Sequence, residues 1–354
     1  MTVEYKVIIR TSSKLGAGTD APLSVVLAGT NGESEPHTLD KRFLNDFDAG
    51  GVGGDWLLDS GLPSSLRCGI RMTLFRNPRD RIPVLLFLCV FALDLTVYFT
   101  ARSWWLPVLW LAVWAIPKGW ICAWNHHHQH VPMFRHALPN RLLEVVFGFQ
   151  TGVTSHAWFL HHVLGHHRNY LEQEKDEARW KRRDGTPMGE LEFSFITALV
   201  AYPRAFRVGL EHPRVMRIFL GMGALQVALL GLLFWHDAYN ALWVFLLPMA
   251  LSLYLTVWAT YFHHVGLETA EHTQASYNIL HPGYNLVTGN LGYHTAHHVR
   301  HGVHWSQLPE LHAQLAKDIP PTHYRQAGLP FVWRGADEKV EVHPPEAEAL
   351  ADHP

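Results

Sequence analysis

Residues 82–100 read "IPVLLFLCVFALDLTVYFT", an apolar run in which Asp94 is the one charged residue. A helix needs ~20 mostly apolar residues to cross a bilayer, so this run is long enough to span one. Three further runs have the same character and cover residues 105–124, 215–235 and 241–262. The sequence therefore predicts an all-α membrane protein with four transmembrane helices, in preference to a soluble protein with buried core helices.

The four runs form two pairs, each joined by a short connection, "ARSWW" at 101–105 and "HDAYN" at 236–240. We expect two helical hairpins. Five arginines lie between residues 67 and 81, and eleven Lys or Arg lie between the hairpins, whereas the two connections hold only Arg102. The positive-inside bias predicts that both termini and the central region face the cytoplasm. Lys118 is expected to reach the interface from near its helix end.

Composition excludes several classes of protein. The 354 residues carry a formal net charge of −2, which argues against a nucleic-acid partner because phosphate binding needs concentrated Lys and Arg. The three cysteines, Cys68, Cys89 and Cys122, are widely spaced and form no CxxC pair. Disulfide scaffolds, Cys-type zinc sites and iron–sulfur clusters are therefore not expected. The 26 histidines point to metal binding instead.

The first 65 residues differ in kind from the rest. "YKVIIRTSS" at 5–13 alternates as a strand does, and "PLSVVLAG" at 22–29 is a second β-rich run. Residues 5–47 resemble the start of a PLAT (lipoxygenase-homology) β-sandwich, a resemblance that implies docking onto lipid or protein. We expect a small β-rich segment at 1–65, a membrane domain at 66–330 and a disordered tail at 331–354.

Histidines gather in four short stretches: "HHHQH" at 126–130, "HHVLGHH" at 161–167, "FHHVG" at 262–266 and "HTAHH" at 294–298. With the topology above, all four lie near one membrane face. On a helix, residues three or four apart share a face, so His126 and His130, His162 and His166, and His294 and His297 can each aim two rings at one point. In the doublets His166–His167 and His297–His298, the neighbouring ring could bind a second metal. The candidate ligands are His126, His130, His162, His166, His167, His264, His294, His297 and His298.

Nine rings exceed the four that a structural zinc ion needs and suit two ions of higher coordination number. Imidazole binds iron, copper, nickel and zinc alike, so the ligand type does not select the metal. Any one cluster alone is more often ordinary surface or core histidine. A histidine-rich metal transporter would place its ligands inside the spans, which are almost free of histidine.

The boxes HxxxH, HxxxHH and HxxHH resemble those of the membrane fatty acid desaturase and hydroxylase superfamily. The resemblance covers residues 77–325, and "LGYHTAHHVRHGVHWSQLPELH" at 291–312 is especially similar to the third box of bacterial acyl desaturases. It implies a cytoplasmic helical cap that holds a non-haem di-iron centre, and the introduction of a double bond into an acyl chain with O2 and two electrons. A di-iron hydroxylase or alkane-type monooxygenase is the nearest alternative. Proteins of this superfamily often carry an Asn four residues before the ligand in the last span, where this chain has Thr260.

Carboxylates near the boxes are candidates for orienting the ligand rings, and we expect this role of Asp176 and Glu268. His127, His128, His161 and His263 fall outside the pattern and are expected either to contact the ligand rings or to be structural. The chain has no haem or iron–sulfur signature, so electrons must come from a separate donor, a ferredoxin or cytochrome. The basic residues 181–183 are a candidate docking site for it, against the alternative of a solvated charge run. The acyl substrate could be bound to lipid, CoA or a carrier.

Overall fold

The computed structural model describes residues 24–25, 28–29, 32–33, 37–38 and 74–328. At the N-terminus, β1 (Ser24–Val25) pairs antiparallel with β4 (His37–Thr38), and β2 (Ala28–Gly29) pairs antiparallel with β3 (Gly32–Glu33). The rest of the expected β-rich segment at 1–65 and the expected tail at 331–354 lie outside the described residues. The three domain boundaries therefore stay predictions.

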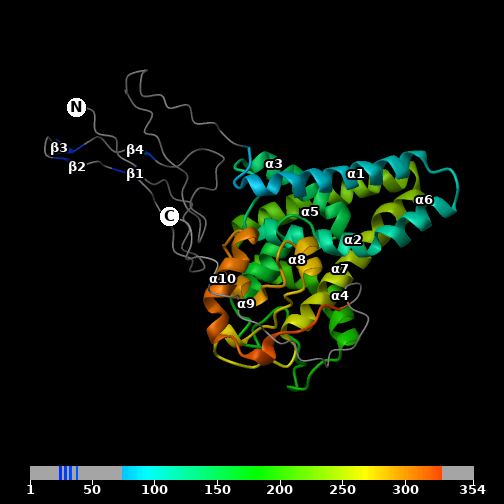
Figure 1. The fold of residues 1–354 in the computed structure, drawn as a ribbon. Helices are drawn as coiled ribbons and strands as arrows, with labels where there is room; N and C mark the ends of the chain where they lie inside the picture. The colour runs from blue at the N-terminus through cyan, green and yellow to red at the C-terminus, as the bar shows by residue number, and fades with distance from the viewer. Residues whose placement is uncertain (1–23, 26–27, 30–31, 34–36, 39–73, 329–354) are drawn as a thin grey trace, which may run out of the picture.

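All named elements within residues 74–328 are helices, as the apolar runs predict (Figure 1). The longer ones are α1 (Arg81–Thr100), α2 (Trp105–His130), α3 (Ala137–Thr151), α4 (Glu190–Gly209), α5 (Pro213–His236) and α7 (Leu247–His264). Shorter helices are α6 (Ala238–Ala241), α8 (Pro282–Thr288), α9 (His294–Val299) and α10 (Leu308–Leu315). The remaining helical elements are of two kinds. Two are π-helical segments, η3 (Phe159–His167) and η4 (Leu242–Leu246), and the others are the 3-10 turns η2 (Pro78–Asp80), η5 (His272–Gln274), η6 (Trp305–Gln307), η7 (Ala316–Asp318) and η8 (Pro321–His323).

Four helical stretches are long and apolar enough to cross a membrane: Pro78–Thr100, Trp105–His130, Pro213–His236 and Ala238–His264. They coincide with the four runs predicted from the sequence. Large apolar side chains on them face outward, among them Leu85, Leu109 and Val227, as expected for a lipid-facing surface. In Figure 1, α6 lies at one end of this bundle, and α8 to α10 lie toward the other.

The expectation for Lys118 was wrong. Its side chain is fully buried, and its Nζ lies 2.8 Å from Asp94 Oδ1, so the ion pair joins α2 to α1 inside the bundle. Trp110 Nε1 also donates to Asp94, at 2.9 Å. A buried ammonium is tolerated where a counter-charge and hydrogen bonds surround it. Asp94 on the neighbouring helix supplies both, so Lys118 need not reach the interface.

One face of α4 is apolar and exposed, although α4 is not among the four candidate spans. Leu191, Phe195, Leu199, Phe206 and Leu210 are each between 45% and 71% exposed. They recur at helical spacing and lie opposite the buried residues Thr197 and Ala201. The helix that leads into α5 therefore extends the apolar exterior of the bundle.

The chain after α7 folds back against the end of that helix. Tyr277 N donates to His263 O at 2.8 Å, and Asn278 Nδ2 donates to Thr295 Oγ1 at 2.7 Å. These bonds hold α9 beside the C-terminal end of α7. Because α2 ends and η3 lies in the same region, histidines that are far apart in the sequence become neighbours.

Candidate metal centre

Four helical segments supply the nine candidate histidines to one buried region. His126 and His130 end α2, three come from η3, His264 ends α7, and three come from α9. Eight of the nine side chains are buried, and His130 is partly exposed. The structure thus brings together every ring that the boxes predict as a ligand.

Five rings form a first group, which we call group A. It comprises His126, His130, His162, His167 and His297, whose candidate ligand atoms all lie within 4.8 Å of one another. His126 Nε2 lies 2.7 Å from His162 Nε2 and 3.1 Å from His130 Nε2. His167 Nε2 lies 3.0 Å from the Nε2 atoms of both His162 and His297. The ring nitrogens therefore converge on a common centre.

The remaining four rings form a second group, group B, which comprises His166, His264, His294 and His298. His166, His264 and His298 have candidate ligand atoms within 4.8 Å of one another. His294 adjoins them, because its Nε2 lies 3.0 Å from His264 Nε2 and 3.1 Å from His298 Nε2. Group B shares η3 and α9 with group A, so the two centres are neighbours.

The pairing of rings differs from the prediction in two places. His162 was expected to share a centre with His166, but it joins His167 in group A, while His166 turns to group B. The reason is that η3 is a π-helix, whose backbone hydrogen bonds join residues five apart, and its wider turn brings His167 to the same side as His162. In α9, His294 was expected to pair with His297, but His294 pairs with His298, four residues on, and His297 points to group A.

The chemistry of these donors fits bound metal ions. Burial, reinforced by the neighbouring rings, lowers the pKa of His162, His167 and His297 well below the ordinary value. The same causes act on His294 and His298. These rings are therefore neutral at physiological pH. Neutral Nε2 atoms that converge at about 3 Å cannot all be satisfied by donating to one another, but their lone pairs can all bind a cation.

Contacts on the far side of two rings fix their tautomer. His166 Nδ1 donates to Asp176 Oδ1 at 2.8 Å, and His264 Nδ1 donates to Ala275 O at 3.1 Å. Each ring then presents Nε2 to group B, the arrangement that orients metal-binding histidines. Asp176 is itself buried and accepts from Ala178 N at 2.7 Å, so its carboxylate is held in place.

The structure contradicts the role expected of Glu268. Its carboxylate pairs with Lys181, and its side chain is 58% exposed. Beyond His264 the helix ends and the chain turns through Gly266, which has a φ of +82° and lies in the left-handed region. The spacing of four residues therefore no longer places Glu268 on the face of the ligand, and the carbonyl of Ala275 contacts that ring instead.

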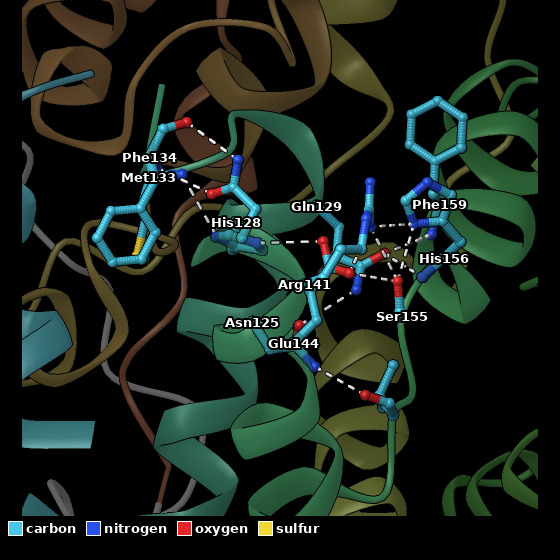
Figure 2. A network of polar contacts seen from close by, with 12 residues as sticks. Asn125, His128, Gln129, Met133, Phe134, Arg141, Glu144, Ser155, His156 and Phe159 are labelled. Atoms are coloured by element: carbon cyan, nitrogen blue, oxygen red, sulfur yellow. Dashed lines mark hydrogen bonds and ion pairs between the residues drawn. The ribbon is translucent and has the colours of Figure 1, made fainter. Parts of the chain in front are cut away.

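A buried polar network behind group A joins α2, α3 and the turn before η3 (Figure 2). Gln129 Oε1 accepts from His156 N at 3.1 Å and from Phe159 N at 3.3 Å. Glu144 accepts hydrogen bonds from Arg141 and Ser155, and its Oε1 lies 3.4 Å from His128 Nε2. The network fixes where η3 begins relative to the histidines of α2.

An apolar cavity of about 230 Å³ opens onto both groups. His126 and His162 of group A and His294 of group B form part of its wall. The rest of the wall is largely aliphatic and aromatic, with Ile116, Gly119, Trp120, Ala123, Trp158, Leu255, Trp258, Ala259 and Leu291 among the lining residues. A long apolar molecule in this cavity would lie against the edge of both candidate centres.

Residues 102–328, about two thirds of the chain, match the fatty acid desaturase family. The chain belongs to the fatty acid desaturase family. Residues 5–53 match the PLAT/LH2 domain, as the resemblance of residues 5–47 predicts. No curated protein matches the chain. Membership supports an oxidoreductase function of the desaturase and hydroxylase type at a membrane, and the two groups of histidines provide the metal-binding side chains that such a function needs.

Sequence reasoning missed one histidine beside the centre of this desaturase-family chain. The His301 ring lies 5.7 Å from that of His130 and 5.2 Å from that of His167. It follows His297 by four residues, so helical spacing was an available signal.

Thr260, at the position where the family often has Asn, donates its hydroxyl to Thr256 O at 3.0 Å and lines the apolar cavity.

The four histidines outside the pattern of the boxes have partners away from the two centres, or lie beside them. His127 Nε2 lies 3.1 Å from Thr288 O, and His128 adjoins Glu144. His263 donates from Nδ1 to Tyr277 O at 2.9 Å, and its ring stacks on His294 with centroids 4.0 Å apart. The centroid of the His161 ring lies 6.4 Å from that of the Trp158 ring. None of these four belongs to either group of clustered ligand atoms among the described residues.

Proposed function

We propose that this protein is a membrane-bound fatty acyl desaturase that introduces a C=C bond into an acyl chain, using O2 and two electrons at a di-iron centre. The apolar cavity carries the proposal, because rings from both groups form part of its wall. An acyl chain in that cavity would present adjacent methylene groups to both metal positions at once.

Group A would hold one iron ion and group B the other. Bound iron would supply the oxygen-activating chemistry that abstraction of hydrogen from an unactivated methylene requires and that side chains cannot provide. Asp176 would keep His166 in the ligating tautomer.

The protein's own contribution is to bind and orient the acyl chain. Trp158 and Leu255 contribute apolar wall, which would keep water away from the reacting carbons of a bound chain. Fixing one carbon pair close to the oxidant can lower the barrier by ~7–11 kcal/mol. The overall reaction removes two hydrogens from neighbouring carbons, takes up two electrons and two protons, and converts O2 to two water molecules.

The two electrons would come from a separate ferredoxin or cytochrome on the cytoplasmic side. The distribution of basic residues supports a multi-pass topology in which both termini and the metal centre face the cytoplasm. The acyl group would be bound to lipid, CoA or a carrier protein.

Expression in a host with a defined lipid profile, under 18O2, tests the proposal. We expect unsaturated acyl chains with no added oxygen, formed only in the presence of O2. His166→Ala should abolish this product, because it removes a group B ligand. An alcohol that carries labelled oxygen would instead identify a hydroxylase, and a product formed without O2 would exclude both reactions.

A further inference from the structure

A second, much smaller cavity lies behind the wall of the apolar cavity, where η3, α4 and α7 meet. Its volume is about 10 Å³. That is close to the space that one water molecule needs. Trp158, His162 and Thr260 line both cavities, so these three residues separate the two.

Three residues that line this small cavity each carry a buried polar side-chain atom with no hydrogen-bond partner among the residues that the structure describes. The three atoms are Trp158 Nε1, His161 Nε2 and Thr197 Oγ1. All three side chains are more than nine-tenths buried, with relative exposures of 7%, 6% and 2%. Buried polar groups are nearly always satisfied by protein or ordered water, so three such atoms around one cavity call for a shared ligand.

The donor pattern defines the ligand. Trp158 Nε1–H can only donate. In the neutral tautomer that carries its proton on Nδ1, His161 Nε2 accepts. The Thr197 hydroxyl can do either. A ligand that satisfies all three must accept from Trp158 and donate to His161 within a space for one small molecule, and among the described residues no charged side chain lines the cavity to favour an ion.

We propose that this cavity is a binding site for a single ordered water molecule, which accepts from Trp158 Nε1 and donates to His161 Nε2, with Thr197 Oγ1 as its third partner. The water anchors the Trp158 indole from behind. The indole also lines the larger apolar cavity, and its centroid lies 5.4 Å from the His162 ring and 6.2 Å from the His126 ring.

The anchored indole would fix the cavity wall beside group A, and with it the position of the acyl chain. The water site itself stands on the three polar atoms alone. Its role in selecting the carbon pair rests on the proposed function.

Two variants of one residue test the site. Thr197→Val keeps the shape of the side chain and removes the hydroxyl, while Thr197→Ser keeps the hydroxyl. If water is bound, Thr197→Val leaves it short of a partner and lowers the melting temperature, and Thr197→Ser stays closer to wild type. If the cavity is dry, Thr197→Val removes an unpaired polar atom and raises the melting temperature. The sign of the shift therefore decides the matter without any assay of activity.

A structure of the wild-type protein in lipid nanodiscs, at a resolution that shows waters, gives the direct readout. We expect one water within hydrogen-bonding distance of the three atoms, and its loss in Thr197→Val. Wild-type density with no water there overturns the site.

The anchoring role is tested by the products. Thr197→Val should broaden the distribution of double-bond positions, and Thr197→Ser should retain the wild-type distribution. Water density together with an unchanged distribution in Thr197→Val overturns the anchoring role. A wild-type protein that forms no unsaturated product contradicts the proposed function instead, and leaves the density and melting-temperature results to decide the water site.

Discussion

Asp176 and Glu268 are two carboxylates that lie close to the histidine boxes in sequence but in different environments. Asp176 is buried and receives the Nδ1–H of His166, whereas Glu268 is more than half exposed and pairs with Lys181. Sequence proximity could not distinguish them, because the turn at Gly266 that displaces Glu268 depends on the backbone after α7.

We predict that Asp176→Asn weakens metal binding ~10–100-fold, the range typical for loss of a group that orients a ligand histidine. The reason is that the neutral asparagine amide holds the proton on His166 Nδ1 less firmly than the aspartate charge does. Competition with a graded series of chelators, followed by iron analysis, measures the affinity. Glu268→Gln is the matched control and should bind metal as wild type does. If both variants bind iron with the same affinity, Asp176 does not orient the ligand histidine.

The buried carboxylate of Glu144 makes the stability of the protein depend on pH (Figure 2). Burial alone would raise the pKa of this carboxyl, but the hydrogen bond and charge of His128 and the charge of Arg141 outweigh it and bring the pKa to about 2. A depressed pKa stabilises the fold above the unfolded value of 4.5. That contribution is lost as the pH falls through about 4.5 towards about 2.

Glu144→Gln should therefore destabilise the protein at pH 7 by about 3 kcal/mol, at 1.36 kcal/mol for each pKa unit. The gap between wild type and variant should narrow as the pH falls below about 4.5. Thermal unfolding across this pH range measures it. A gap that stays constant down to pH 3 would argue that the carboxylate charge is not the stabilising feature.

The π-helix η3 is the element that distributes the central box between the two centres. Gly165 lies within it, and a Cβ at that position would come within 2.6 Å of Glu177 Cγ and 3.2 Å of Leu160 O. Glu177 cannot readily move aside, because Arg207 holds its carboxylate. The close approach thus explains why the box contains a glycine between Leu164 and His166.

We predict that Gly165→Ala displaces η3, lowers stability by roughly 1–3 kcal/mol as overpacking does, and reduces the iron retained after purification. Gly221→Ala is the control, because a Cβ there meets no atom of the described residues within 4 Å and an alanine favours the helix. Melting temperature and iron content of the two variants measure the effect. A Gly165→Ala protein with wild-type iron content would contradict the role of this close approach.

The elements were predictable to different degrees. Apolar length alone located the four candidate spans, and the histidine spacing identified all nine clustered rings. The division of those rings into groups was not predictable, because the edge-to-face contact of His162 with His167 depends on the π-helix η3, which the spacing of the histidines does not reveal. The exposed face of α4 also escaped prediction, since its interrupted apolar pattern is shorter than a span.

The exposed basic residues of the molecule differ in how well they could serve as a docking site for an electron donor. Of residues 181–183, the candidate docking site, Lys181 pairs with Glu268 and Arg182 with Glu192. Group A reaches the surface elsewhere, at His130, with His301 beside it. Arg168 and Arg300 are exposed and directly follow or precede histidines of that region. An acidic donor that docks there would have the shorter path to the metals.

We therefore predict that the double variant Arg168→Glu and Arg300→Glu is reduced by an acidic [2Fe–2S] ferredoxin at least ~10-fold more slowly at low salt, because electrostatic steering is lost. Reduction by dithionite should be unchanged. Arg183→Glu is the control. Anaerobic stopped-flow absorbance measures both rates, and a larger effect in the control would return the docking site to residues 181–183.

Two iron ions held by the histidines of groups A and B are central to the proposed reaction. Iron analysis with Mössbauer spectroscopy of purified, catalytically active protein in lipid nanodiscs tests this directly. We predict two irons per chain, with His126→Ala and His166→Ala each losing iron and O2-dependent product together. Active protein that contains no iron, or that keeps both irons after these substitutions, would contradict it.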